Sequence, residues 1–219
     1  MAVDNLQYLP TYTLKKKPIE NVFNRIIKRS FDIVFSLFVI VSILLWLIPI
    51  LYILIKIESR GSAIFKQKRN GLDYKTFDCL KFRSMKTNSF SDKKTTIKGD
   101  ERITKIGQFI RRTSIDELPQ FLNVLKGEMT VVGPRPHMVS QTEIFKESIH
   151  NFDERHTIKP GITGLAQVSG SRGEIKNNKD ILKRLKYDIF YIEKWSFLLD
   201  IKIIYKTILQ VLKGDEKAI

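Results

Sequence analysis

Two adjacent carboxylates placed among cations are the side chains of this sequence best suited to chemistry. Asp116 and Glu117 follow closely after Arg111 and Arg112. A carboxylate can attack phosphorus or hold a divalent metal ion, while nearby guanidinium groups neutralise the phosphate oxygens that would otherwise repel it. The pattern Ser114-x-x-Glu117 is also typical of a capping box, in which both side chains bind the free amides of a helix start. The stretch alone therefore leaves a phosphate site and a helix cap as equal alternatives.

Pro119 weighs against the capping box. If Ser114 capped the helix, Pro119 would lie inside it and would remove one of its hydrogen bonds. This favours a kink, or a helix that starts nearer the proline. The apolar residues of 121–125 recur at helical spacing, and Gly127 predicts the end of this helix.

Length and composition limit the classes of protein that this chain can form. Its 219 residues fit one domain with an appendage, and 38 basic against 23 acidic residues give a formal charge of +15. Such a charge indicates an anionic partner, which could be nucleic acid, anionic lipid or a phosphorylated substrate. The single cysteine, Cys79, excludes an internal disulfide and a zinc site built from cysteines. We expect Cys79 to be a small core residue.

A long apolar segment near the N-terminus predicts a membrane helix. No residue from Ile33 to Ile55 carries a formal charge. A helix over this segment would be ~34 Å long, enough for the ~30 Å hydrocarbon core of a bilayer. The segment is too long for the apolar part of a signal peptide.

Two features favour a helix that turns back over one that spans the bilayer. Pro49 lies deep in the apolar run, and proline bends a helix in the turn before it. Equal numbers of basic residues lie within about 20 residues of either end of the segment, as expected if both ends stay on the cytoplasmic face. We therefore expect a re-entrant helix, and a proline-kinked span is the alternative.

The chain after the membrane segment reads as a compact α+β domain that is mostly helical. Residues 62–68 and 75–82 are strand candidates, and Asn70-Gly71 between them predicts a tight hairpin turn. Residues 87–98 form a polar stretch that predicts a surface loop, and residues 105–112 have the spacing of a helix.

Two further basic motifs are candidates for binding anions. Strand alternation places Lys81 and Arg83 on one face, which is compatible with a phosphate site or with a charged strand edge. Residues 129–132 predict a short buried strand that leads into Pro134, Arg135 and Pro136. The prolines restrict the backbone, so Arg135 could be presented to an anion, and a rigid surface turn is the alternative.

The C-terminal part predicts two helices, 181–195 and 196–212, with lysines between aliphatic and aromatic residues. These are compatible with amphipathic helices at an anionic membrane surface or with core helices that have solvated faces. The three histidines share no spacing typical of a metal site.

Several motifs, in order along the chain, together resemble the bacterial sugar transferases, the monotopic polyprenyl-phosphate phosphoglycosyl transferases. The motifs are Lys81-Phe82-Arg83-Ser84-Met85, Arg111-Arg112-Thr113-Ser114-Ile115-Asp116-Glu117-Leu118-Pro119-Gln120, Val131-Val132-Gly133-Pro134-Arg135-Pro136 and Lys159-Pro160-Gly161-Ile162-Thr163-Gly164. The resemblance covers residues 25–215. It implies a basic segment 1–30, a re-entrant membrane helix 31–57 and a catalytic domain 58–219 on the cytoplasmic face of the bacterial inner membrane.

The resemblance also implies an enzyme that moves a sugar 1-phosphate from a UDP-sugar to undecaprenyl phosphate and releases UMP. This is the first membrane step in the assembly of capsule, exopolysaccharide, O-antigen or other glycans. Asp116 would be the nucleophile, giving a phosphosugar-aspartyl intermediate, and Glu117 would hold Mg²⁺. Partners would be the two substrates and anionic membrane lipids, with no nucleic acid. The sequence leaves open which sugar is moved and whether the protein is a homodimer.

The other implied site residues are cations and one acid. Arg111 and Arg135 would bind phosphate, Lys81 and Arg83 are further candidates, and Asp188 matches a motif acid of the family. The chain departs from the family pattern at two positions. Ile48 stands before Pro49 where many short members have serine, and Leu165 stands where tryptophan is common.

Two other functions remain as alternatives. A membrane-anchored glycosyltransferase would leave the phosphate of the sugar on the nucleotide and release UDP instead of UMP. A basic membrane-tethered scaffold or nucleic-acid binder would show no transfer, and the chain contains no recognised nucleic-acid motif.

Overall fold

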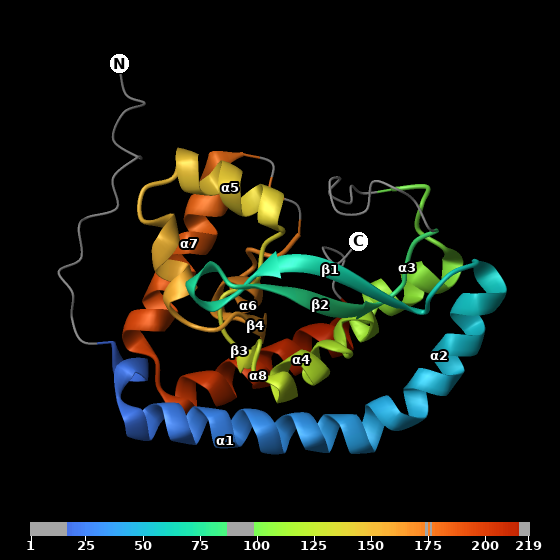
Figure 1. The fold of residues 1–219 in the computed structure, drawn as a ribbon, viewed down its shortest axis with the longest axis horizontal. Helices are drawn as coiled ribbons and strands as arrows, with labels where there is room; N and C mark the ends of the chain where they lie inside the picture. Colours follow the sequence, from blue (N-terminus) through green and yellow to red (C-terminus); the bar gives the residue numbers. More distant parts are fainter. Residues whose placement is uncertain (1–16, 87–98, 174, 176, 215–219) are drawn as a thin grey trace.

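The N-terminal part of the protein is one long bent helix that wraps around a mixed domain. The computed structural model describes residues 17–86, 99–173, 175 and 177–214. After a short 3₁₀ turn, Pro18–Glu20, helix α1 runs over Val22–Val39 and continues through the π-helical segment Ile40–Leu44 into α2, Leu45–Glu58. α1 lies along one side of the domain, and α2 turns up along a second side (Figure 1). The helix thus starts at Val22, before the expected limit at residue 31.

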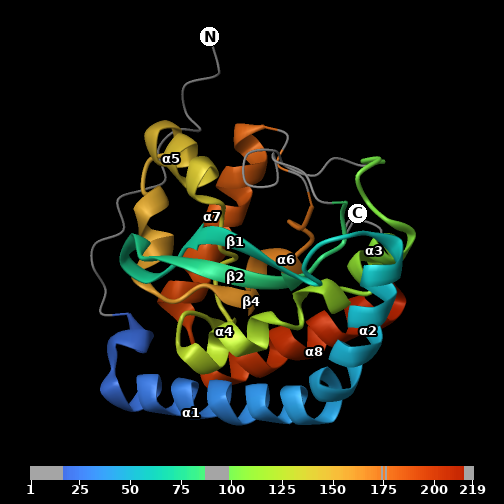
Figure 2. The ribbon, with the colours of Figure 1, turned by 45° about the vertical axis from the view of Figure 1, so that its right-hand side comes forward.

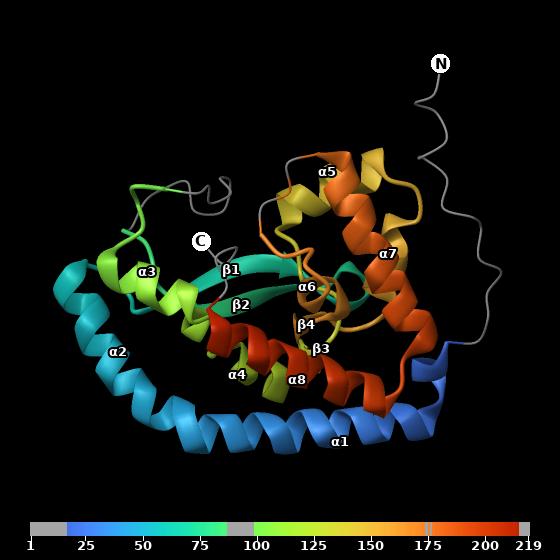
Figure 3. The same cartoon turned by 180° about the vertical axis from the view of Figure 1, so that it is seen from behind.

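The direction of the long helix changes where α1 passes into α2, as Figures 1 and 3 show. The π-helical segment widens the helix there, and such segments are common causes of bends. Pro49 lies inside α2 and deprives the carbonyl four residues earlier of its donor. A bend close to Pro49 was expected, and the structure adds the π-helical segment before it.

The inner face of α1 is polar and is bound to the domain. Lys28 Nζ lies 2.7 Å from a carboxylate oxygen of Asp200 and 3.0 Å from the carbonyl oxygen of Val132. One turn further on, Asp32 accepts hydrogen bonds from Thr130 Oγ1 at 2.6 Å and from Val131 N at 2.9 Å. Ion pairs and hydrogen bonds that are fully buried hold their partners in one geometry, since breaking them leaves a charge unpaired. The contacts of Lys28 and Asp32 therefore fix α1 against the domain.

The first sheet is the expected hairpin. β1, Ile64–Asn70, pairs antiparallel with β2, Thr76–Phe82, from Ile64 opposite Phe82 to Asn70 opposite Thr76. Residues 87–98, the expected surface loop, lie outside the described residues.

The prediction of a tight turn at Asn70-Gly71 is wrong. The strands are joined by a 3₁₀ turn, Leu72–Tyr74, and the positive φ angles fall on Asp73 and Tyr74. Tyr74 stacks on His156 with ring centroids 4.2 Å apart, and His156 Nδ1 lies 3.1 Å from the carbonyl oxygen of Gly71. This contact with the 3₁₀ segment Phe152–Thr157 draws the longer turn onto the domain.

A second, parallel sheet lies at the centre of the domain. β3, Thr130–Val132, pairs with β4, Gly161–Thr163. Gly133 and Gly161 touch so closely that a Cβ added to Gly161 would lie 2.1 Å from the backbone nitrogen of Gly133. A side chain has no room there, which explains why both motif segments contain glycine at this contact.

Helices surround the two sheets. They are α3 Lys105–Arg112, α4 Gln120–Lys126, α5 Val139–Ser148, α6 Leu165–Val168, α7 Asn178–Lys194 and α8 Phe197–Lys213. α8 runs beside α1 (Figures 2 and 3), and Phe31 of α1 meets Phe197 of α8 edge to face at 5.2 Å. The main core joins α1, α4, α7 and α8 around β3, and Cys79 is buried in it, as expected. The expected mostly helical α+β class is confirmed.

The end of α2 is fixed to the start of α3. Both carboxylate oxygens of Glu58 accept hydrogen bonds from backbone amides, at 2.7 Å from Lys105 N and 2.9 Å from Ile106 N. These are free amides at a helix N-terminus, where a negative charge is favoured. α3 leads directly to Asp116 and Glu117, so α2 helps to set the position of both acids.

Candidate active site

The two acids lie in a turn between α3 and α4. Ser114 has a φ of 57°, which reverses the chain after α3, and a 3₁₀ turn, Ile115–Glu117, follows. α4 begins right after Pro119, as the proline predicted. Ser114 caps no helix. Its Oγ accepts a hydrogen bond from Arg172 Nη2 at 2.8 Å, so the capping-box alternative is wrong.

Glu117 is held by two cations. Arg135 binds both of its carboxylate oxygens, with Nη2 2.5 Å from Oε1 and Nη1 3.2 Å from Oε2. Lys81 Nζ lies 2.8 Å from Oε1. Burial acts to raise the pKa of Glu117, but Arg135 and Lys81 outweigh it and hold the pKa well below its usual value. Glu117 is therefore a fixed anion.

Asp116 is buried but differently placed. Within the described parts of the chain, no hydrogen bond or ion pair engages its carboxylate. Burial raises the pKa of Asp116 to about 6, although Lys81 acts in the opposite direction. Among the described residues, no partner competes for its oxygens. Two neighbouring acids thus have different environments, one locked in ion pairs and one available to react.

The loop that carries Arg135 is held in place by the buried ion pair between Arg155 and Asp188. Arg155 Nη2 donates to the carbonyl oxygen of Arg135 at 2.7 Å and lies 2.9 Å from a carboxylate oxygen of Asp188. Arg155 Nη1 also contacts His137 Nδ1 at 2.6 Å. The side chains of Arg155 and Asp188 are only 3% and 4% exposed, so they support the loop and do not reach an open site. Asp188 supports the loop by holding Arg155. The sequence analysis did not identify Arg155, because no sequence pattern marks it.

Other cations surround the acids. The Nε atom of Arg111 is buried without a hydrogen-bond partner in the described structure, and Arg111 acts to lower the pKa of Asp116. Arg172, which sequence reasoning also missed, acts to lower the pKa of Glu117. Arg184 donates to the carbonyl oxygen of Gly173 at 2.6 Å and thereby holds the loop of Arg172. Lys81, Arg111, Arg135 and Arg172 form a concentration of positive charge suited to phosphate groups.

Arg83 does not join these cations. Its guanidinium donates to the carbonyl oxygens of Arg60 at 2.9 Å and of Ser59 at 2.6 Å, at the C-terminal end of α2. A cation at a helix C-terminus satisfies free carbonyl groups. Strand alternation predicted one face for Lys81 and Arg83, but β2 ends at Phe82. Arg83 lies beyond the strand and binds the end of α2, whereas Lys81 binds Glu117.

We expect replacement of Arg83 by methionine to reduce stability without weakening nucleotide-sugar binding. The variant leaves the carbonyl groups at the end of α2 without their charged donor, which costs about 2–3 kcal/mol of the free energy of unfolding. The measurement is the thermal midpoint together with the KM for a UDP-sugar. Lys81→Met, two residues earlier in the chain, is the contrasting variant and should impair turnover. A large rise in KM with unchanged stability in Arg83→Met would show that Arg83 binds substrate.

The arrangement is suited to chemistry at phosphorus. Asp116 can attack an electrophile, and Lys81, Arg111 and Arg135 can neutralise charge on phosphate oxygens. Within the described parts of the chain, no group of three His, Cys, Asp or Glu side chains could hold a metal ion by itself. A metal held here would need ligands from a substrate, as Mg²⁺ bound to nucleotide phosphates commonly has.

Comparison with known proteins agrees with this chemistry. The family described as bacterial sugar transferase matches residues 23–214. A "UDP-glucose:undecaprenyl-phosphate glucose-1-phosphate transferase" of Klebsiella pneumoniae is 44% identical over 209 residues, which are 94% of this chain and 44% of that protein. An "Undecaprenyl-phosphate glucose phosphotransferase" of Komagataeibacter xylinus is 44% identical over 204 residues, covering 89% of this chain and 37% of that protein.

A shorter relative is matched over nearly its whole length. The "Exopolysaccharide production protein PSS" of Rhizobium leguminosarum is 42% identical over 195 residues, which are 85% of this chain and 96% of that protein. The chain spans less than half the length of the Klebsiella and Komagataeibacter proteins. The family match covers α1 through α8, including the two acids and the cations around them. The chain therefore belongs to the bacterial sugar transferase family.

Proposed function

We propose that the protein transfers a sugar 1-phosphate from a UDP-sugar to undecaprenyl phosphate and releases UMP. The observation that carries the proposal is the contrast between the two acids. Asp116 is buried and without a described partner, whereas Glu117 is paired with Arg135 and Lys81. The names of the Klebsiella and Komagataeibacter relatives support the class of reaction.

The proposed reaction has two displacement steps. A carboxylate oxygen of Asp116 attacks the phosphorus next to the sugar, the bond from this phosphorus to the UMP oxygen breaks, and UMP leaves with the electron pair. A phosphate oxygen of undecaprenyl phosphate then attacks the same phosphorus and frees Asp116. Arg135 and Arg111 stabilise negative charge on the phosphate that is transferred. Lys81 offsets the negative charge of the two acids and of the phosphate groups.

Glu117 would hold Mg²⁺ in this proposal. The donor set fits, because Mg²⁺ usually takes one or two protein carboxylates and completes its shell with water and substrate phosphate oxygens. When bound, the ion would neutralise charge on the diphosphate. Arg135 and Lys81 position Glu117 through the contacts described above.

The same proposal places the long N-terminal helix in the inner membrane as a re-entrant helix. Val22–Glu58 is long and apolar enough to cross a membrane, and one face exposes residues such as Phe38, Trp46 and Ile53. Its two ends are bound to the same domain, α1 through Lys28 and α2 through Glu58. These contacts support the proposal that both ends lie on one side of the membrane, and the UDP-sugar that the domain would use supports the cytoplasmic side.

Analysis of the released nucleotide tests the function. Purified protein incubated with UDP-glucose, other UDP-sugars, Mg²⁺ and undecaprenyl phosphate should release UMP and form a lipid-linked sugar diphosphate. Release of UDP would instead indicate a glycosyltransferase. Salt-sensitive nucleic-acid binding without any transfer would indicate the binding protein considered above.

A further inference from the structure

The end of β1 also holds the loop that carries Arg135. Arg69 Nη1 donates a hydrogen bond to the carbonyl oxygen of Pro136 at 2.5 Å. The preceding carbonyl group, that of Arg135, accepts a hydrogen bond from Arg155 Nη2 at 2.7 Å. Two guanidinium groups therefore bind successive carbonyl oxygens of the loop. Both fix the backbone from which the Arg135 side chain reaches Glu117.

The hydrogen-bond partners of Arg69 in the described structure are uncharged. Its Nε and Nη2 atoms lie 3.2 Å and 2.6 Å from Gln67 Oε1, two residues earlier on β1. Gln67 is buried, and its Nε2 donates to Met138 Sδ at 3.1 Å, which fixes the amide with its oxygen toward Arg69. Among the residues that the structure describes, no carboxylate forms an ion pair with Arg69. A glutamate in place of Gln67 would neutralise the guanidinium, whereas the glutamine leaves its charge in place.

The charge of Arg69 acts on the residues that hold Glu117. Burial lowers the pKa of Arg69, because the charged form loses water, and repulsion by Arg135 lowers it further. Glu117 acts in the opposite direction. Arg155 differs, since Asp188 lies 2.9 Å away and offsets its charge. Arg69 thus adds to the positive potential beside Arg135, and a phosphate group bound there would relieve the repulsion between the two guanidinium groups.

We propose that Arg69 is a positioning residue of the phosphate site and that its unneutralised charge strengthens the binding of a diphosphate beside Arg135. Arg69 acts in two ways, through the carbonyl group of Pro136 and through its electric field. Gln67 holds the guanidinium without cancelling that field. The proposal rests on the proposed function for the identity of the diphosphate as part of a UDP-sugar, and it adds a group that sets the affinity for this substrate.

Gln67→Glu separates the charge of Arg69 from its structural role. The glutamate keeps the acceptor for Arg69 and adds a negative charge that pairs with it, so the thermal midpoint should stay the same or rise. We expect the affinity for inorganic pyrophosphate to fall about fivefold, the order of magnitude for one charge that acts through a partly solvated site. The measurement is titration calorimetry on the full-length protein in neutral detergent with Mg²⁺ present. The KM for a UDP-sugar should rise by a similar factor, while kcat changes less.

Arg69→Lys is the converse variant. The ammonium group keeps the charge but cannot reproduce the planar fork that binds Gln67 and Pro136 together. We expect a lower thermal midpoint and a lower kcat, because the loop of Arg135 is held less well. Arg69→Met removes the fork and the charge, and it should bind pyrophosphate more weakly than Arg69→Lys. A role in structure alone predicts equal pyrophosphate affinity for these two variants.

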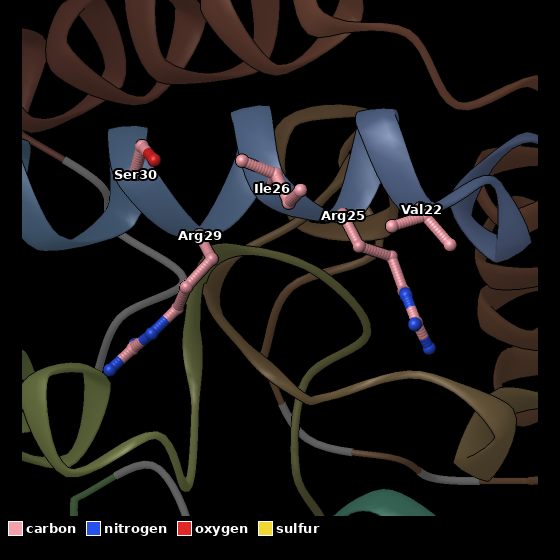
Figure 4. Close-up of a pocket in the computed structure, with 5 residues that line it drawn as sticks. All are labelled: Val22, Arg25, Ile26, Arg29 and Ser30. Atoms are coloured by element: carbon pink, nitrogen blue, oxygen red, sulfur yellow. The ribbon is translucent and has the colours of Figure 1, made fainter.

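Arg25→Gln is the matched control for net charge, because it makes the protein less positive by one charge, as Gln67→Glu does. Arg25 is exposed on α1, beside a small pocket (Figure 4). One turn further along α1, Arg29 donates to carbonyl oxygens at the C-terminal end of α4, which is the end remote from the two acids. The pyrophosphate affinity of Arg25→Gln should therefore stay unchanged.

The outcomes distinguish this inference from the proposed function. Unchanged pyrophosphate affinity in Gln67→Glu would overturn the inference. So would an equal loss in Gln67→Glu and Arg25→Gln, because the effect would then follow from net charge alone, and so would a lack of pyrophosphate binding by the unaltered protein. Pyrophosphate binding needs no transfer. A selective loss in Gln67→Glu, without UMP release from any UDP-sugar, would support the role of Arg69 and contradict the proposed function.

Discussion

Replacement of Asp116 by asparagine will abolish sugar-phosphate transfer while the protein stays folded. The amide keeps the shape of the carboxylate but cannot form the bond to phosphorus, and loss of a nucleophile typically lowers kcat by at least about 10,000-fold. Because the carboxylate is buried and has no described partner, the neutral amide should not reduce stability. The measurement is UMP release from a UDP-sugar, together with the thermal midpoint.

Asp73→Asn is the control for this experiment. Asp73 is an exposed carboxylate in the hairpin turn, and asparagine tolerates its positive φ of 49°. This variant should retain full activity. Substantial UMP release by Asp116→Asn would rule out Asp116 as the nucleophile, and a lowered midpoint would mean that its charge has a stabilising partner.

Replacement of Asp188 by alanine will strongly destabilise the protein and reduce transfer. The variant leaves the guanidinium of Arg155 buried without its counter-ion, and breaking a buried ion pair in this way costs about 3–5 kcal/mol. Arg155 also holds the carbonyl oxygen of Arg135, so the loop that binds Glu117 loses its support. Denaturant unfolding measures the first effect, and kcat at a temperature where the variant is folded measures the second.

The matched comparison is a carboxylate in an ion pair at the surface. Asp78 lies 3.0 Å from Lys68 Nζ across the hairpin, and the two side chains are 44% and 65% exposed. Asp78→Ala should change stability slightly, because exposed pairs are solvated in the folded and unfolded states. If Asp188→Ala unfolds no more easily than Asp78→Ala, the support of Arg135 by Arg155 does not depend on Asp188.

Regular elements were the part of the fold that the sequence predicted well. Helical spacing identified α3, α4, α7 and α8, strand patterns identified the hairpin, and Pro119 and Gly127 correctly marked the limits of α4. These are local signals, because side chains a few residues apart decide them. The proximity of Lys81, Arg135 and Glu117 was expected from the family motifs, and the structure brings the three together.

The errors arose where a distant contact decided the outcome. The pattern Ser114-x-x-Glu117 is typical of a helix cap, but the Ser114 hydroxyl binds Arg172, 58 positions further along the chain. The Asn70-Gly71 pair favours a tight turn, but stacking of Tyr74 on His156 selects a longer one. Arg83 lies in a basic motif, and only the folded chain shows that the end of α2 is its partner. Local spacing contains no information on such contacts.

The second half of α2 is part of the interior of the catalytic part. Leu51 and Ile55 share a buried cluster with Phe82 and Ile110, so the segment that we propose to lie in the membrane also completes this interior. Its removal would expose this cluster and leave the guanidinium of Arg83 and the first amides of α3 unsatisfied. The proposed anchor and the catalytic part thus share one interior, and we expect a chain cut between them to lose its folded catalytic part.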